Sequence, residues 1–535
     1  MSDSSNSSES LDPSHPAFRL EDPAKYKPGG YCPLEIGQEL HNNRYRILHR
    51  LGHGGYSTVW LALDQSYDTS APPDPLRPRY VALKIVSASR GQQEATLLRE
   101  LQAQLQPRLA RPSPPGHYQH RSGHIIALLD YFQISGPNGS HCCLVTEVLG
   151  PSVAALHRYP GIAGPNMLPL SIARCVAMQC AEALAVLHSW GIVHAGIFYR
   201  RAGLLPLEQQ LTECVIDLHP GNIALALTAD INSLTVEQLY EALGGKPTKI
   251  PFDEAPGTGS YDSYDSTPLD SGSYDSSPID KAKLHEPEYL VATPSVPHLW
   301  ALCATTEPRI RIIDLSESFR IPFCPDSQPL PGTPRGFAAP ELLLNLPAEV
   351  NFPIDIWALG CTIYTLLGHS SPFHTIYGHL SRVLAHIVIL TGGEDHMPER
   401  FWLAFSKYPG LKTSEKELRS LDKRLLNWDC HLRGQPRGSG AGTFRNLPPL
   451  DIRDHEVLMA VVAAALVVDP AKRAPAKKIL EIMHEGWGAV AEQGVLGLDR
   501  LGRMQNLESK MHDCNIFSIN QRGSVSRLAP IYHTL

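Results

Sequence analysis

The chain has 535 residues, of which 43% are apolar, and carries a formal net charge of −7 at pH 7. Its length suits two or three domains or one large two-lobed domain, and its apolar share suits a globular protein with a core. The weakly acidic balance does not indicate a nucleic-acid-binding surface, so we expect no direct contact with nucleic acid. The 11 cysteines are scattered without a C-x-x-C pair, which argues against a disulfide framework or a zinc site and indicates reduced thiols in an intracellular protein.

The N-terminal part of the chain is polar and acidic, which is not typical of a signal peptide. The longest apolar run, residues 458–468, is too short to span a bilayer, so we expect a buried helix there and no membrane association. Residues 1–30 are rich in Ser, Pro and Asp and are predicted to be disordered. With an ordered stretch over 31–43 they form a lead-in, residues 1–44, before regular structure starts near Tyr45.

A glycine-rich segment, residues 51–60, precedes a strand-like run that contains Lys84. Glycine lets the backbone approach phosphate oxygens closely, because no Cβ intervenes and unusual φ values cost little. A hairpin formed by 46–48 and 58–62 would carry this loop, with Val59 over an adenine ring and Lys84 within reach of the α- and β-phosphates. The alternative is a glycine turn in any β protein with a surface lysine behind it.

Helices and strands are expected at several places further along the chain. Residues 92–105 carry leucines at helical spacing, with Glu94 on the first turn. Ser171 is a candidate N-cap for a long helix. The apolar stripe of that helix is Ile172, Val176, Cys180, Leu184 and Leu187. Residues 309–313 indicate a strand, and the run from 356 to 367 is apolar nearly all round, which is typical of a buried helix.

Two segments have the composition of connections rather than of core. Residues 64–79 interrupt the small sheet as a surface loop. Residues 254–279 are of low complexity with repeated Ser-Tyr-Asp, lie within a longer spacer over 230–300, and are expected to be flexible. The residues after 487 form a C-terminal tail, 488–535.

Further motifs follow in the order found in eukaryotic protein kinases, which the chain resembles over residues 45–487. They are the strand and hinge 144–149, the catalytic loop 217–222, the metal-binding segment 314–316, the end of the activation segment 339–341, the buried helix from Asp355, and Arg473, which would pair with Glu341. Any one tripeptide is common by chance, whereas the ordered set is not. The resemblance implies an α+β, two-lobed kinase fold. Its N-lobe, 45–149, would be a small antiparallel sheet with one helix, and its C-lobe, 150–487, mainly helical.

The resemblance also implies roles for individual residues. Lys84, held by Glu94, would fix the triphosphate of ATP, with Glu100 as the second candidate for its partner. Asn222 and Asp314 would bind Mg²⁺, which prefers oxygen ligands. Asp217 would orient the substrate hydroxyl and accept its proton. The residues expected to contact the nucleotide are Leu51, Gly52, His53, Gly54, Gly55, Tyr56, Ser57, Thr58, Val59, Ala82, Lys84, Glu147 and Leu149.

Within the kinases, the chain is similar to the SR-protein kinases of the fungal type. The similarity rests on the lead-in 26–37, the loop exit 56–61, the hinge 147–152 and the long spacer between Asn222 and Asp314. It implies phosphorylation of serine or threonine in Arg/Ser-rich RNA-binding proteins, by a monomer. In that family the spacer influences location, so the resemblance implies a cytoplasmic or nuclear protein.

Residues 196–216 interrupt the catalytic loop between Ala195 and Asp217, and removing them restores an intact motif. Closing such a loop costs on the order of 3 kcal/mol, which a fold tolerates. Catalysis is less tolerant, since about 1 Å of misplacement can cost a hundredfold in rate. We favour a translated intron or a gene-model error, because loops of this length are uncommon inside a domain. The alternative is a native insertion in a damaged or regulated kinase.

Three single positions also depart from the kinase pattern. His219 replaces a lysine that contacts the γ-phosphate, and a neutral imidazole neutralises less charge. Ser316 replaces a glycine, which stiffens that turn. Ala195 replaces the arginine that docks a phosphorylated activation loop, so we expect activity without activation-loop phosphorylation. A pseudokinase that binds nucleotide without transfer, and a kinase for another Ser/Thr substrate class, are the alternatives that these departures leave open.

Overall fold

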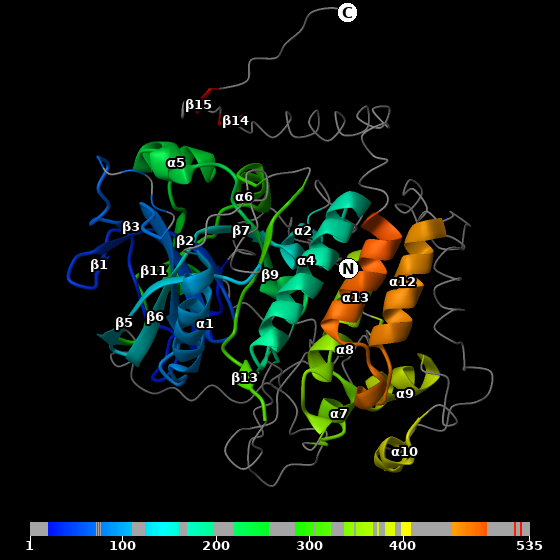
Figure 1. The fold of residues 1–535 in the computed structure, drawn as a ribbon. Coiled ribbons are helices and arrows are strands. Elements are labelled where there is room, and N and C mark those ends of the chain that lie inside the picture. The colour runs from blue at the N-terminus through cyan, green and yellow to red at the C-terminus, as the bar shows by residue number, and fades with distance from the viewer. Residues whose placement is uncertain are drawn as a thin grey trace, which may run out of the picture.

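The computed structural model describes residues 20–109 apart from 71, 73 and 75, then 124–157, 159, 168–195, 218–255, 284–303, 307–322, 336–346, 349–367, 372–373, 380–390, 397–407, 452–488, 518–519 and 525–526. These residues form two lobes, one built around a twisted sheet and one built mainly from helices (Figure 1). The insertion 196–216, Asp217 and almost all of the low-complexity segment lie outside the described residues. The predicted α+β, two-lobed architecture is confirmed.

The N-lobe is a six-stranded antiparallel sheet in the order β1-β2-β3-β4-β6-β5, with helix α1 packed on one face. Its elements are β1 (Glu39–Leu40), β2 (Tyr45–His53), β3 (Ser57–Asp64), β4 (Tyr80–Val86), α1 (Gln93–Leu109), β5 (Leu128–Gly136) and β6 (Gly139–Thr146). The predicted hairpin around the glycine loop is β2 and β3, and the predicted helix over 92–105 is α1. Lys84 lies in register with Val59 on one side and with Leu144 on the other, so β4 places it at the centre of the sheet.

The lead-in is packed into the fold from Leu20 onward, earlier than its composition predicts. Tyr26 is 5% exposed and makes edge-to-face contacts with Tyr31 and Phe252. A buried ion pair joins Glu21 to Arg50 of β2. The predicted disorder up to residue 30 therefore extends too far, because these contacts come from partners remote in sequence that local composition does not reveal.

The two ends of the spacer also fold against the N-lobe. They form α5 (Val236–Ala242), β10 (Lys249–Pro251), β11 (Tyr289–Val291) and α6 (Val296–Ala301), with short 3-10 turns at Ile231–Ser233 and Phe252–Glu254. A capping box between Thr235 and Gln238 starts α5. Leu234 and Leu239 pack with Leu48 of β2 in one apolar cluster. Strands β10 and β11 pair antiparallel, so the segment between them leaves from and returns to the N-lobe.

The C-lobe is organised around four helices, α4 (Leu170–Ser189), α8 (Pro353–Leu367), α12 (Ile452–Ala465) and α13 (Ala476–Met483), each of which contacts two of the others (Figure 1). Its other helices are α2 (Val153–His157), α7 (Pro340–Leu343), α9 (Leu380–Leu390) and α10 (Glu399–Phe405), and a single turn follows α13 at His484–Gly488. Short strands lie beside the cleft, namely β7 (Leu149–Ser152), β8 (Ile192–Val193), β9 (Ile223–Ala226), β12 (Ile310–Ile312) and β13 (Phe319–Arg320), and β14 (Ser518–Ile519) pairs with β15 (Val525–Ser526). Gly360 lets α8 approach α12, since a Cβ there would lie 2.8 Å from that of Ala465.

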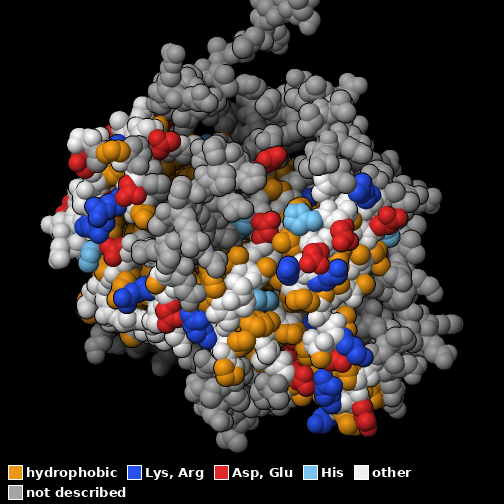
Figure 2. Space-filling model, viewed as in Figure 1, with side chains coloured by type: hydrophobic (Ala, Val, Ile, Leu, Met, Phe, Trp, Pro, Cys, Tyr) orange, Lys and Arg blue, Asp and Glu red, His pale blue; other side chains and the backbone are white. Residues whose placement is uncertain are grey.

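Helix α4 carries the predicted apolar stripe, which is buried between α8 and α13. By length and composition alone α4 could cross a membrane, but its burial is that of a core helix. The predicted cap at Ser171 is wrong: the helix begins at Leu170, and its N-cap, Pro169, makes no side-chain cap bond. The apolar run 356–367 lies within α8, and the run from 458 ends its helix at Ala465. On the face in Figure 2, acidic and basic side chains are interspersed over both lobes.

Candidate functional site

Three of the predicted site residues meet in the cleft between the lobes. The Nζ of Lys84 lies 2.8 Å from Oε1 and 2.7 Å from Oε2 of Glu94 on α1, and 2.8 Å from Oδ1 of Asp314. The backbone N–H of Leu315 also donates to Glu94, at 3.2 Å. Glu94 is thus the partner of Lys84, whereas Glu100 pairs with the exposed Arg320 of β13.

Lys84 and Asp314 stabilise each other's charges. Burial disfavours the charged form of Lys84, but attraction from Asp314 and Glu94 outweighs it and raises the pKa of the ammonium. Burial likewise opposes ionisation of Asp314, and the charge and hydrogen bond of Lys84, with a hydrogen bond from Ser316, lower its pKa to about 2. At neutral pH the cluster therefore presents a cation beside an ionised carboxylate, the charges needed to hold a triphosphate and a metal ion.

The glycine-rich loop lies between β2 and β3 and covers a cleft over Lys84. That cleft is lined by the loop residues Gly54, Gly55, Tyr56 and Ser57, and by Lys84, Glu94 and Asp314. A Cβ at Gly52 or at Gly55 would meet nothing within 4 Å. None of these glycines has a positive φ in the structure. Glycine is therefore useful here because it leaves open space for a ligand, and an unusual backbone conformation is not the reason for it.

The lead-in holds the outer side of this loop. The Nζ of Lys25 donates to the carbonyl oxygen of Gly55 at 3.0 Å, and the hydroxyl of Tyr31 donates to that of Gly54. Burial raises the pKa of the Tyr31 hydroxyl, which keeps it a donor at every physiological pH. Sequence reasoning missed these two residues, because only the resemblance drew attention to the lead-in and it assigned them no role.

The predicted hinge follows β6 and leads into β7. Ala82 of β4 lies in register with Thr146, the last residue of β6, so it lies beside the point where the chain leaves the sheet for the hinge. The side chain of Glu147 faces Arg311 of β12, with 2.7 Å between Oε1 and Nε. This ion pair ties the hinge to the strand that precedes Asp314. The backbone groups of Glu147 and Leu149 stay the predicted contacts for the base.

The two predicted metal-binding residues lie on adjacent chain segments. Asn222 ends a short turn (Pro220–Asn222), and its carbonyl oxygen accepts from the N–H of Ile313 at 2.9 Å, which brings it next to Asp314. Among the described residues, Oδ2 of Asp314 accepts no hydrogen bond, while Oδ1 takes those of Lys84 and Ser316. One carboxylate oxygen and a nearby amide fit Mg²⁺, which is usually bound by one or two carboxylates plus substrate phosphates.

Asp314 has a φ of 64°, a left-handed conformation that costs a non-glycine residue roughly 1–2 kcal/mol. The hydrogen bonds from Lys84 and from the hydroxyl of Ser316, at 2.8 Å, hold it there. Ser316, which departs from the kinase pattern, thus contacts the carboxylate that is predicted to bind metal. His219 has a different local role, because its Nδ1 accepts the N–H of Gly221 at 2.9 Å and caps the turn.

Asp217 lies outside the described residues, but both flanks of the catalytic loop are in place. The N–H of Ala195 donates to Oδ1 of Asp355 at 3.0 Å. The carbonyl oxygen of Leu218 accepts from the hydroxyl of Thr362 at 2.7 Å. Asp355 and Thr362 both belong to α8 and lie about 10 Å apart along its axis. The two ends of the interruption are thus anchored to one buried helix.

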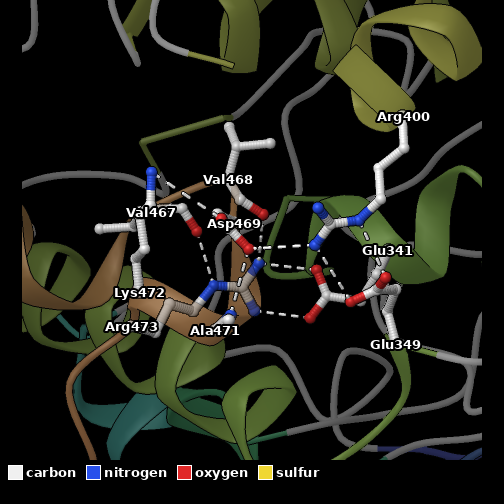
Figure 3. A network of polar contacts seen from close by, with 9 residues as sticks. All are labelled: Glu341, Glu349, Arg400, Val467, Val468, Asp469, Ala471, Lys472 and Arg473. Atoms are coloured by element: carbon white, nitrogen blue, oxygen red, sulfur yellow. Dashed lines mark hydrogen bonds and ion pairs between the residues drawn. The ribbon is translucent and has the colours of Figure 1, made fainter. Parts of the chain in front are cut away.

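A polar network below the cleft includes the predicted pair of Glu341 and Arg473 (Figure 3). Nη1 and Nη2 of Arg473 each lie 2.6 Å from a carboxylate oxygen of Glu341, and both side chains are 0% exposed. Arg473 also donates to the carbonyl oxygens of Val467, Val468 and Pro353. The prediction that these two residues pair is confirmed.

Comparison with known proteins agrees with this geometry. No protein-family model matches the chain. Protein kinase dsk1 of Schizosaccharomyces pombe is 38% identical over 179 residues, which are 33% of this chain and 29% of that protein. The serine/threonine-protein kinase SRPK of Physarum polycephalum is 25% identical over 465 residues, 85% of this chain and 89% of that protein. SRSF protein kinase 3 of Mus musculus is 35% identical over 205 residues, 36% of this chain and 33% of that protein.

The chain matches 29% of the length of dsk1 and 16% of that of spk-1 of Caenorhabditis elegans. A solved kinase domain aligns with a TM-score of 0.42 at 16% identity, over 84% of this chain and 96% of that one, a likeness too weak to argue from. All these relatives are protein kinases by name, and two of them, SRPK and SRSF protein kinase 3, carry SR-protein kinase names; they confirm the resemblance drawn from the motifs.

Proposed function

We propose that the protein is an ATP-dependent protein kinase that phosphorylates serine or threonine in Arg/Ser-rich proteins. The observation that carries the proposal is the contact of Lys84 with both Glu94 and Asp314, because it assembles the triphosphate-binding cation and the metal-binding carboxylate in one cleft. Phosphoryl transfer depends on positioning and charge neutralisation more than on covalent chemistry, and this cluster supplies both.

In this mechanism each residue has one task. Lys84 neutralises the α- and β-phosphates of ATP, and Asn222 with Asp314 would hold Mg²⁺, which draws charge from the β- and γ-phosphates. Asp217 orients the substrate hydroxyl and takes its proton as the oxygen bonds to the γ-phosphorus. The bond from that phosphorus to the bridging oxygen breaks, and ADP leaves.

The anchored flanks of the catalytic loop favour an active enzyme once residues 196–216 are absent. Ala195 and Leu218 are both 0% exposed, and α8 holds each through a hydrogen bond. A chain that joined Ala195 directly to Asp217 would need to span only this short stretch of α8. We therefore keep the proposal that 196–216 is not part of the working kinase.

The names of the relatives support a substrate class for this chain. Two of them are SR-protein kinases by name, so we propose Arg/Ser-rich RNA-binding proteins as the partners of this chain. We further propose that it works as a monomer, without direct contact with nucleic acid or membrane, and that it is found in the cytoplasm, the nucleus or both.

The test measures transfer of labelled phosphate from MgATP to an Arg-Ser repeat peptide, with a general basic protein as second substrate. Four proteins are compared: the chain as written, the chain lacking 196–216, and each with Asp217→Ala. We expect the shortened chain to be active, Asp217→Ala to abolish transfer, and the peptide to be preferred. If the proteins bind nucleotide but none of the four transfers phosphate to either substrate, the kinase proposal is contradicted and the chain is a pseudokinase.

The interruption itself is tested on the transcript. Sequencing the message across codons 195–217 should show spliced forms that join Ala195 to Asp217. If every spliced message retains the stretch, residues 196–216 are native, and the activity of the chain as written decides whether they act as an off-switch.

A further inference from the structure

Side chains from three separate segments meet at the tip of the glycine-rich loop. Tyr56 belongs to the tip, Arg90 lies in the connection between β4 and α1, and Glu317 follows Asp314 in the activation segment. The guanidinium carbon of Arg90 lies 3.8 Å from the centre of the Tyr56 ring. The Nη1 of Arg90 lies 3.1 Å from Oε1 of Glu317.

The planar guanidinium group of Arg90 makes two different contacts at once. Its face stacks on an aromatic ring while its edge binds a carboxylate, a combination that an ammonium group does not offer. The side chain of Arg90 is 17% exposed and that of Glu317 is 4% exposed, so solvent screens their attraction only in part. The contact is therefore less screened by solvent than a surface ion pair is.

The group lies at the phosphate side of the cleft. Tyr56, Arg90 and Glu317 line the same cleft as Lys84 and Asp314. The backbone adds a further tie, because the carbonyl oxygen of Tyr56 accepts from the N–H of Ser87 at 2.8 Å. The tip of the loop is therefore fastened to the connection before α1, and through Glu317 to the segment that carries Asp314.

We propose that Tyr56, Arg90 and Glu317 form a clasp that holds the glycine-rich loop over the phosphates of bound nucleotide while Asp314 is in its metal-binding position. Arg90 is in this view a positioning residue that acts through Tyr56. The inference rests on the proposed function, because the phosphates are those of ATP. A loop already held in its binding position loses less freedom when nucleotide binds, which strengthens binding.

The clasp predicts an effect confined to phosphate-bearing ligands. Calorimetry on the full chain would measure the affinity for the magnesium complex of a non-hydrolysable ATP analogue and for adenosine. We expect Arg90→Ala to weaken binding of the analogue on the order of tenfold, the scale of a partly desolvated cation–π contact, and to leave adenosine binding unchanged. The matched control is Arg99→Ala, because Arg99 stacks on Tyr131 at 4.8 Å on the outer side of α1 and should affect neither ligand.

Removal of Arg90 also leaves Glu317 buried beside Asp314 and Glu94 with less counter-charge, so a second variant is needed. Tyr56→Leu keeps the ion pair and removes only the ring. We expect it to weaken analogue binding too, and the double variant to bind no more weakly than Arg90→Ala alone, because Arg90→Ala already removes the stacking contact.

Unchanged analogue affinity in Tyr56→Leu and Arg90→Ala would overturn the clasp, as would tighter binding or an equal loss for adenosine. Full additivity of the two changes would overturn it as well. Failure of the unaltered chain to bind the analogue is a different result, because it contradicts the proposed function itself and the clasp with it.

Discussion

Arg473 and Glu341 form a two-pronged ion pair in which both hydrogen bonds measure 2.6 Å and neither side chain is exposed. The pair joins the start of α7 to the turn Pro470–Lys472 before α13, segments far apart in sequence (Figure 3). The remaining donors of Arg473 bind backbone carbonyls, so its charge is fully paired. Such a pair fixes how segments dock even where its net contribution to stability is small.

We therefore expect Arg473→Ala to lower the free energy of unfolding by about 3–5 kcal/mol, since it leaves the carboxylate of Glu341 buried without a partner. Chemical denaturation would measure the loss. The control is Lys478→Ala, which breaks the exposed pair with Glu481 and should cost less than about 1 kcal/mol. Equal losses in the two variants would contradict the argument.

The fold and the centre of the site were accessible from sequence because their signals are local or ordered along the chain. The glycine-rich loop located the hairpin of β2 and β3, and the helical spacing of leucines located α1. The kinase resemblance then identified Glu94 on that helix as the partner of Lys84. The order of the motifs along the chain then predicted that Asp314 belongs to the same site as Lys84 and Glu94. These features depend on short-range patterns, which a single sequence displays.

Contacts between remote segments were not accessible in the same way. Nothing local marks Arg90 as the partner of Glu317, or Tyr31 as a donor to the glycine loop. The folding of residues 20–30 was missed for the same reason, since polar composition hid the buried Tyr26. Contacts between side chains that are remote in sequence leave no periodic pattern in the sequence, so only the structure shows them.

Because Glu94 and not Glu100 contacts Lys84, we expect a Glu→Gln substitution to affect catalysis differently at the two positions. Glu94→Gln removes a buried partner of Lys84, so we expect kcat/KM for the Arg-Ser peptide to fall at least tenfold. Glu100→Gln breaks a pair whose side chains are 42% and 47% exposed, and should change kcat/KM less than about threefold. Steady-state kinetics on the shortened chain measures both, and a larger loss in Glu100→Gln would reverse the assignment.

The lead-in predicts an effect on ATP binding from outside the cleft. Tyr31→Phe removes the hydrogen bond to Gly54, worth about 0.5–1.5 kcal/mol, so we expect the KM for ATP to rise roughly threefold to tenfold while kcat changes little. The control is Tyr80→Phe, which removes a hydroxyl bond of 2.8 Å to the carbonyl of Leu234, away from the loop. A rise in KM in both variants would show general loosening of the N-lobe instead.

The ionisation of the Glu317 carboxyl makes the stability of the folded protein depend on pH. Burial raises its pKa from 4.5 to about 7, with Arg90 and Lys84 opposing the shift and Asp314 and Glu94 adding to it. Because this pKa lies higher in the folded protein than in the unfolded chain, the folded state holds the extra proton. The contribution to stability is complete below pH 4.5 and is lost as pH rises through about 7.

We therefore expect the melting temperature of the unaltered chain to fall between pH 5.5 and pH 8 by more than that of Glu317→Gln, which carries no titrating group at this position. Thermal unfolding of the two proteins at both pH values measures the difference, and other titrating groups cancel in the comparison. His194, whose pKa is lowered by burial, shifts stability in the opposite direction in both proteins alike. Parallel pH profiles for the two proteins would show that Glu317 is ionised in the folded state across the whole range.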